Sequence, residues 1–347
     1  MRTTRRQSPS PAGDITIFRI ENASGAWVEV SSLGAGIIGV GVPDRLGEIA
    51  NVALAYDDPA DYAGDGPCLG KCPGRYANRI AGGDLTVAGR RYRLAVNCGP
   101  NHLHGGPTGF HNRIWDSAET EDGVEFTYLS ADGEENYPGN LRVKAIYRWS
   151  DDNTLSLEFH AETDAETVVN MTNHAYWNLR GADSGSVLAH EMRMKASRWL
   201  VTDESLVPTG ELSDVGGTPM DFLTFKPLGQ DLHADFPAVI YGKGYDNCWA
   251  IDGWRPGLMS RNAVELRDKC SGRTLTVDSD QPGVQVYTAN WLSDSPRRKV
   301  RNFEDYDGVA IEMQGFPDAP NRPEFPSQTL RPGEEYRRTI IFRFGTF

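Results

Sequence analysis

Four short segments of this chain combine hydrogen-bonding side chains with aromatic or small residues. They are residues 74–80, 101–106, 172–179 and 310–314. Together they supply an imidazole and a carboxylate that can move protons, a pair of arginines and several amides. Such groups donate and accept hydrogen bonds in the way that vicinal hydroxyls require. The combination predicts a site that binds a polyhydroxylated small molecule and transfers protons on it.

Glu312 and His174 are the two residues in these segments best suited to proton transfer. Glu312 follows the apolar run 309–311, which predicts the end of a buried strand. Burial raises the pKa of a carboxyl group and makes it a better base near neutrality. An outward-facing strand glutamate is the simpler alternative. Histidine exchanges a proton near pH 7, although a single histidine more often has a structural role.

The set of segments resembles the aldose 1-epimerase (mutarotase) family. The string Thr-Asn-His-x-Tyr-x-Asn-Leu around His174 and the stretch 314–321 after Glu312 carry much of the likeness, which spans roughly residues 26–344. Trp177 stands where phenylalanine is usual. The resemblance implies that Glu312 is the general base, that His174 protonates the ring oxygen, and that neither a metal nor another cofactor is needed.

The resemblance also implies a set of sugar-binding residues. They are Arg75, Asn78, Arg79, His104, Tyr176, Asp246 and Gln285. Taken alone, the segment 75–79 could be a solvated loop, Asp246 a turn residue and Gln285 a strand residue. His102 and His104 could share one face of a strand and bind a metal, but no third ligand is evident, and His102 is expected to have only a supporting role.

Two positions depart from the family pattern. Residues 111–114, which include His111 and Arg113, stand where an acidic residue is more usual, and Ala289 replaces a glycine. We expect these changes to affect which sugar fits. Trp177, Trp249 and Trp291 could be platforms for a sugar ring or core residues.

Alternation of apolar and polar residues dominates the chain and predicts an all-β fold. The expected strands include residues 15–20, 27–30, 124–129, 141–149, 154–161, 263–266, 274–277, 284–288 and 339–344, with a hairpin at 87–92 and a short helix at 57–62. We expect one large antiparallel β-sandwich over residues 14–347, which is also the fold of the family. Residues 1–13 are polar and are expected to form a disordered tail.

Composition excludes several classes of function. The net charge of −13 argues against nucleic acid as a partner. No signal peptide or membrane span is evident, and five cysteines without regular spacing suit reduced thiols in a cytoplasmic protein. The expected partner is a monosaccharide, and the expected state is a monomer or a homodimer.

The sequence therefore predicts an enzyme that interconverts the α and β anomers of a free aldose such as galactose, glucose or a pentose. Two alternatives share the fold: an epimerase of hexose 6-phosphates, which needs a cationic pocket, and a non-catalytic sugar-binding or regulatory domain. A glycosidase is less favoured because it needs two carboxylates flanking the bond.

Overall fold

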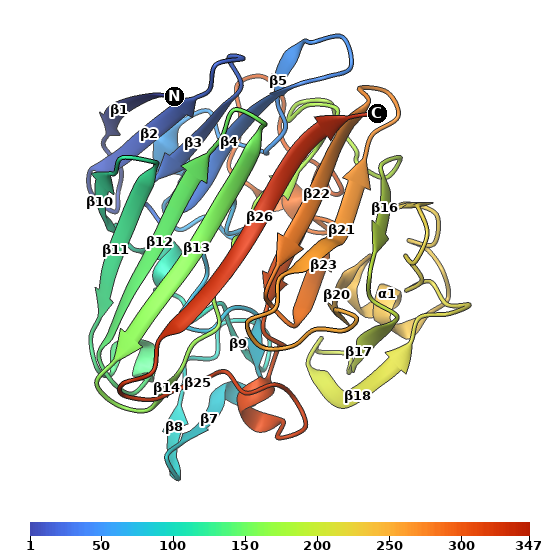
Figure 1. Ribbon diagram of the computed structural model, residues 1–347. Coiled ribbons are helices and arrows are strands. Elements are labelled where there is room, and N and C mark those ends of the chain that lie inside the picture. The colour runs from blue at the N-terminus through green and yellow to red at the C-terminus, as the bar shows by residue number, and fades with distance from the viewer.

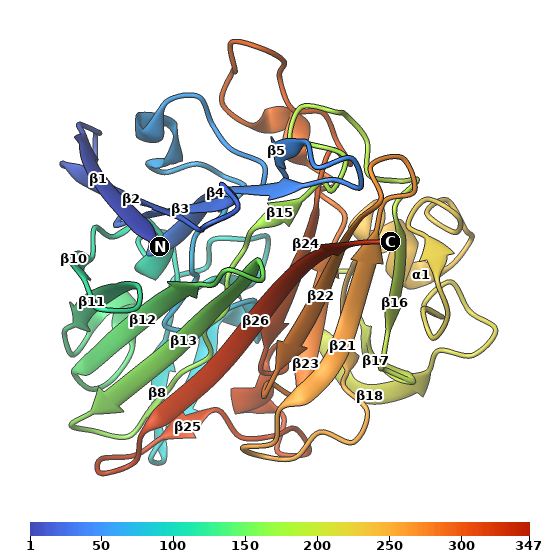
Figure 2. The same ribbon diagram turned by 45° about the horizontal axis from the view of Figure 1, so that its top comes forward.

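The computed structural model describes residues 1–347, and antiparallel strands form most of its regular secondary structure (Figures 1 and 2). The largest sheet crosses the front of Figure 1. Its nine strands are, in spatial order, β10 (Asp116–Glu119), β11 (Val124–Ser130), β12 (Leu141–Trp149), β13 (Thr154–Thr163), β26 (Tyr336–Thr346), β22 (Arg273–Ser279), β21 (Ser260–Arg267), β16 (Glu191–Met194) and β19 (Lys226–Pro227).

Two further sheets complete the sandwich, and Figure 2 places β23 and β24 behind β22 and β26. The six-stranded sheet has the order β15 (Tyr176–Trp177), β24 (Val309–Gln314), β23 (Gly283–Tyr287), β20 (Asp246–Ala250), β17 (Arg198–Thr202) and β18 (Pro208–Asp214). The five-stranded sheet runs in chain order through β1 (Arg2–Ser8), β2 (Ile15–Glu21), β3 (Trp27–Ser31), β4 (Gly36–Pro43) and β5 (Ile49–Asn51).

Short elements connect the sheets. Three two-stranded sheets are formed by β6 (Arg79–Ile80) with β9 (His102–Leu103), β7 (Asp84–Val87) with β8 (Arg90–Arg93), and β14 (Thr167–Val168) with β25 (Thr329–Leu330). The α-helix is α1 (Pro237–Gly242), and the 3-10 helices are η1 (Pro59–Tyr62), η2 (Ala81–Gly83), η3 (Phe110–Asn112), η4 (Glu134–Asn136), η5 (Leu292–Asp294) and η6 (Ala319–Asn321). None of these helices has the length and apolar character that spanning a membrane requires.

The main hydrophobic core lies between the sheets. It joins Phe159 and Phe342 of the nine-stranded sheet, Val286 and Ile311 of the six-stranded sheet and Val28 of the five-stranded sheet. Because side chains alternate along a strand, the neighbours of these residues point away from the core. One face of β23 and β24 is therefore free to build a site.

The alternation predicted from the sequence is confirmed along β13, where Leu155, Leu157 and Phe159 are buried and the residues between them are partly exposed. The predicted hairpin is formed by β7 and β8. The predicted helix near residue 60 is the single 3-10 turn η1, and the Asp58 side chain accepts a hydrogen bond from Ala60 N at 2.9 Å.

The N-terminal segment differs from the disordered tail expected over residues 1–13. Residues 2–8 form β1, which pairs with β2 from Arg2 opposite Glu21 to Ser8 opposite Ile15. Most β1 side chains are exposed, so backbone hydrogen bonds hold the strand. Arg6 Nη2 also donates to Glu29 Oε2 at 3.1 Å. Polar composition therefore gave no signal of this strand.

Candidate functional site

One cavity of about 380 Å³ collects side chains from distant parts of the chain. Its walls come from the segment before β6, the loops after β9 and before β15, the first residue of β20, the end of β23 and the middle of β24. The polar and charged residues that line it are Asn78, Arg79, His104, His174, Asp246, Asp294 and Glu312. The cavity is concave and combines these groups with apolar side chains, as sites for small ligands commonly do.

Glu312 lies in β24, at a position where alternation turns its side chain away from the core that receives Ile311 and Met313. The residue is only 1% exposed. Burial raises the pKa of Glu312 well above its usual value, and the nearby charge of Asp246 adds to the effect while Arg79 opposes it. Glu312 Oε2 has no hydrogen-bond partner within the protein. A buried carboxyl oxygen without a partner costs free energy of folding, and a catalytic role is one reason for a protein to keep it.

His174 faces Glu312 from the loop between β14 and β15, with Nε2 at 3.5 Å from Glu312 Oε1. Burial lowers the pKa of His174 to about 4. Its backbone is fixed on both sides: His174 N donates to Lys71 O at 2.9 Å, and Gly70 N donates to His174 O at 3.0 Å. The environment thus disfavours the charged forms of both Glu312 and His174, and their contact allows the pair to hold and exchange a proton.

Asp246 stands at the start of β20 on the same side of the sheet, and it is held by two donors. Arg79 Nη2 donates to Asp246 Oδ2 at 3.1 Å, and Gln285 Nε2 donates to Asp246 Oδ1 at 2.6 Å. Gln285 pairs with Glu312 in the register of β23 and β24, which brings the two side chains to one face. The arrangement fixes an acidic acceptor and a guanidinium next to Glu312 and His174.

His104 and Asn78 form another wall of the cavity. Both have positive φ, 53° and 63°, which places them in tight turns. Asn78 N donates to His104 Nδ1 at 3.1 Å. His104 Nδ1 is therefore an acceptor, so the neutral ring carries its proton on Nε2 and can donate that hydrogen bond. The His104 and His174 ring centroids are 5.3 Å apart.

Arg75 is placed differently from the prediction. Its guanidinium is buried outside the cavity and donates to the carbonyl oxygens of Pro138 and Gly139 at 2.7 and 3.0 Å and to Ser130 Oγ at 2.6 Å. These partners occupy the groups that were expected to bind a sugar. Gln285 also does not line the cavity and lies behind Asp246. Arg75 therefore has a structural role, and Gln285 acts by orienting Asp246.

The histidines outside the predicted pair have separate environments. His102 bonds Ala95 O through Nδ1 at 2.7 Å and Tyr137 OH through Nε2 at 2.6 Å, outside the cavity. His111 is buried behind His104, with ring centroids 6.4 Å apart. No three His, Cys, Asp or Glu side chains gather in a group that could bind a metal ion.

Arg113, in the segment that departs from the family pattern, makes an ion pair with Glu134 at 2.9 Å and does not line the cavity. Of the three tryptophans considered, Trp177 and Trp249 are core residues, whereas Trp291 lines the cavity and is 57% exposed. Leu206, Tyr287 and Cys98 also line it. The sequence could have pointed to Tyr287, because it lies two residues after Gln285 and so on the same face of the predicted strand 284–288. Leu206 lies in no recognisable motif.

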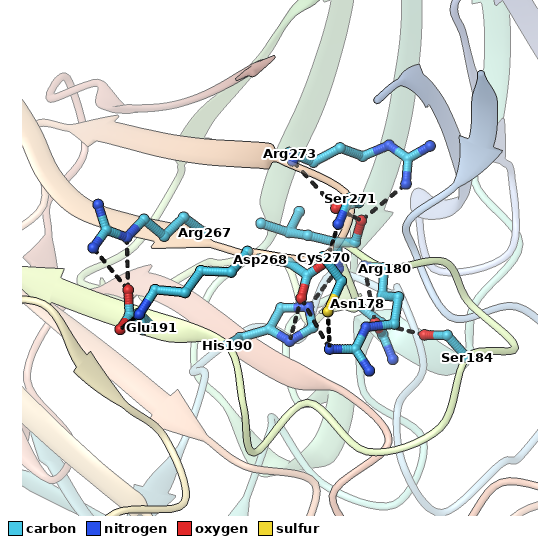
Figure 3. Close-up of polar contacts among 12 residues, drawn as sticks. Asn178, Arg180, Ser184, His190, Glu191, Arg267, Asp268, Cys270, Ser271 and Arg273 are labelled. Carbon is cyan, nitrogen blue, oxygen red and sulfur yellow. Dashed lines mark hydrogen bonds and ion pairs between the residues drawn. The ribbon is translucent and has the colours of Figure 1, made fainter. Parts of the chain in front are cut away.

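A second histidine–carboxylate pair lies elsewhere in the molecule (Figure 3). His190 Nδ1 is 3.9 Å from Asp268 Oδ1, and both side chains are buried. Asp268 also accepts hydrogen bonds from Ser271 N at 2.7 Å and from Arg180 Nη2 at 3.2 Å. His190 Nε2 accepts from Leu179 N at 3.0 Å. None of these residues lines the cavity that holds Glu312 and His174.

Comparison with known proteins gives a consistent result along the whole chain. A family model described as aldose 1-epimerase matches residues 16–343. The galactose mutarotase of Bos taurus is 38% identical over 338 residues, which cover 97% of this chain and 96% of the relative. The aldose 1-epimerase of Escherichia coli strain K12 is 34% identical over 344 residues, which cover 97% of this chain and 98% of the relative.

Solved structures agree with the sequence relatives. An aldose epimerase homologue from C. elegans superposes with a TM-score of 0.87 at 29% identity and covers 99% of both chains. A galactose 1-epimerase from Lactobacillus acidophilus superposes with a TM-score of 0.86 at 28% identity, covering 100% of this chain and 99% of its own. Sequence likeness, fold and full mutual coverage together establish that this chain belongs to the aldose 1-epimerase family.

Proposed function

We propose that this protein interconverts the α and β anomers of a free aldose by acid–base catalysis. The observation that carries the proposal is the contact of 3.5 Å between His174 Nε2 and Glu312 Oε1 at a cavity lined by polar side chains. Family membership supports the same activity. Because the relatives from Bos taurus and Lactobacillus acidophilus are named for galactose, galactose is the first aldose to test.

The proposed reaction needs two proton transfers between the protein and the sugar. The proton that the pair holds first passes from Glu312 to His174 across their contact. Glu312, now the carboxylate, takes the proton from the C1 hydroxyl, and His174, now the imidazolium, gives a proton to the ring oxygen. The C5 oxygen then leaves C1, and the open-chain aldehyde rotates about the C1–C2 bond. Ring closure on the other face returns both protons. General acid and base catalysis of this kind contributes roughly 10²–10⁴-fold to a rate.

The surrounding groups suit the hydroxyls of the sugar. Asp246 is an acceptor, Arg79 is a donor, and His104 can donate from Nε2 because Nδ1 is already occupied. Asn78 and Tyr176 also line the cavity. Trp291 exposes an aromatic face at the same cavity, which suits the apolar C–H face of a sugar ring. We propose that each of these side chains contacts the bound sugar.

The charges around the cavity favour a free sugar over a sugar phosphate. Arg79 is the only Lys or Arg among the lining residues, and it is already paired with Asp246. Lys243 approaches the ring of Trp291 but pairs with Asp305 at 2.6 Å. A desolvated phosphate dianion requires several charge-assisted donors. Arg113, the cation that could have supplied one, pairs with Glu134.

The test is the rate of anomer exchange for freshly dissolved α-galactose, α-glucose and α-glucose 6-phosphate, followed by optical rotation and by NMR exchange. We expect kcat/KM for a free aldose to exceed that for the phosphate by at least tenfold. A preference for the phosphate would reverse the substrate assignment. Sugar binding in calorimetry without any acceleration of exchange would instead identify a non-catalytic sugar-binding protein.

A further inference from the structure

A buried ion pair lies next to the catalytic cavity without lining it. Lys71 Nζ pairs with Asp65 Oδ1, and both side chains are fully buried. Lys71 Nζ also donates to Tyr62 O at 2.7 Å and to Asn112 Oδ1 at 3.1 Å. Asp65 Oδ2 accepts from Leu69 N at 2.9 Å. Burying two charges is expensive even when they are paired, and nothing in the proposed proton transfer uses them.

The segment between the two charges is a wall of the cavity. Gly66, Pro67 and Cys68 all line it. Pro67 O also accepts a hydrogen bond from the hydroxyl of Tyr176, another lining residue, at 2.9 Å. The ion pair therefore closes residues 65–71 into a loop whose residues 66–68 face the cavity.

The end of the same loop holds His174. The backbone of His174 is bonded to Lys71 O and Gly70 N at 2.9 and 3.0 Å, and Asn173 Nδ2 donates to Gly70 O at 2.7 Å. Glu312 is the only polar group paired with the imidazole, whose Nδ1 is unpartnered, and the ring otherwise packs against Tyr176 and His104. The position of the imidazole thus depends on where residues 70 and 71 lie.

We propose that Lys71 is a positioning residue for His174: its ion pair with Asp65 fixes the loop 65–71, whose backbone holds the imidazole against Glu312. The inference rests on the proposed function, since it assigns a role in that reaction. Misplacement of a catalytic group by about 1 Å can cost 10²-fold in rate. A pair with a purely stabilising role would change the unfolding midpoint and leave turnover by the folded protein unchanged.

The main test is the double variant Lys71→Met/Asp65→Asn, which removes both charges together and so leaves no lone buried ion. We expect a folded protein whose kcat falls at least tenfold while KM changes less than threefold. The matched control is Lys226→Met/Asp231→Asn, because Lys226 Nζ also pairs with an aspartate at 2.8 Å and donates to a carbonyl oxygen, Pro219 O, at 2.7 Å. The control should keep the wild-type kcat.

A folded double variant with kcat within threefold of wild type would overturn the proposal. If the double variant does not fold, Lys71→Met replaces it, because burial raises the pKa of Asp65 and a neutral carboxyl group needs no counter-ion. The imidazole NMR signals of His174 should then shift while those of His190 do not, and unchanged His174 signals would also overturn the proposal. Failure of the proposed function is separate, because it would appear as a wild-type protein without anomer exchange.

Discussion

The molecule contains two buried histidine–carboxylate pairs with different surroundings. His174 and Glu312 lie at a cavity and each has an unpartnered polar atom. At the other pair, burial alone would raise the pKa of Asp268, but hydrogen bonds from Ser271 and Arg180 and the charge of His190 hold it below its usual value. The pKa of Glu312 is raised. Both histidines have an unpartnered Nδ1, so the two pairs differ at the carboxylate: Asp268 accepts hydrogen bonds from Ser271 and Arg180, whereas Glu312 Oε2 has no partner.

The largest contrast is expected in catalysis when each carboxylate is neutralised. Glu312→Gln should lower kcat by roughly 10²–10⁴-fold with the fold intact, because an amide cannot accept the proton. Asp268→Asn should leave the kcat of the folded protein within twofold. Stopped-flow polarimetry under matched folded concentrations measures both. A Glu312→Gln variant that keeps more than about a tenth of the wild-type rate would remove the general-base assignment.

Substitution of His174 and of His190 should also affect kcat differently, with a smaller difference than for the two carboxylates. His174→Asn should lower kcat by about 10²-fold, since the acid is lost while other groups still bind the sugar. Calorimetry should give a Kd for the sugar within about threefold of wild type. His190→Asn is the control and should keep its turnover. Lost affinity with unchanged turnover in His174→Asn would mean that His174 binds the sugar and does not transfer protons.

Stability should show the reverse of the contrast in catalysis, because the variant at Asp268 that keeps its turnover is expected to lose stability. Asp268→Asn should lower the free energy of unfolding by about 1–3 kcal/mol, because it weakens hydrogen bonds to a buried charged acceptor. Urea unfolding followed by tryptophan fluorescence gives this value. No loss of stability would show that the contacts to Asp268 in Figure 3 contribute nothing net.

The smallest expected effect concerns pH. The pKa of Glu312 is raised by burial, so the folded protein holds this proton more tightly than the unfolded chain does. Ionisation of Glu312 therefore costs stability as pH rises above about 4.5, the usual glutamate range. Glu312→Gln should gain stability relative to wild type between pH 5 and pH 8. Asp268 has the lowered pKa, so its contribution should be lost only as pH falls below about 4.

Alternation and motif spacing predicted much of this structure. The strands follow the apolar period, and Asn78, Arg79, His104, His174, Tyr176, Asp246 and Glu312 do line one cavity. The sequence could not show that Arg79 lines the cavity and Arg75 does not, because residue type gives the number of donors and not their partners. The carbonyl oxygens that hold Arg75 lie more than 60 positions away in the chain. The role proposed for Lys71 could not be predicted from the sequence either, since the sequence does not show that Lys71 and Asp65 are both buried and paired.

Strand β1 has a consequence for the colloidal behaviour of the protein. Its neighbour β2 reads Ile-Thr-Ile-Phe-Arg-Ile-Glu, a β-prone and largely apolar run. Without β1 this run would be an open sheet edge, which is a template for self-association. β1 covers that edge and presents Arg2, Arg5 and Arg6, charges that discourage another strand from adding. Removal of residues 1–13 is therefore expected to promote aggregation while leaving the cavity that holds Glu312 and His174 complete.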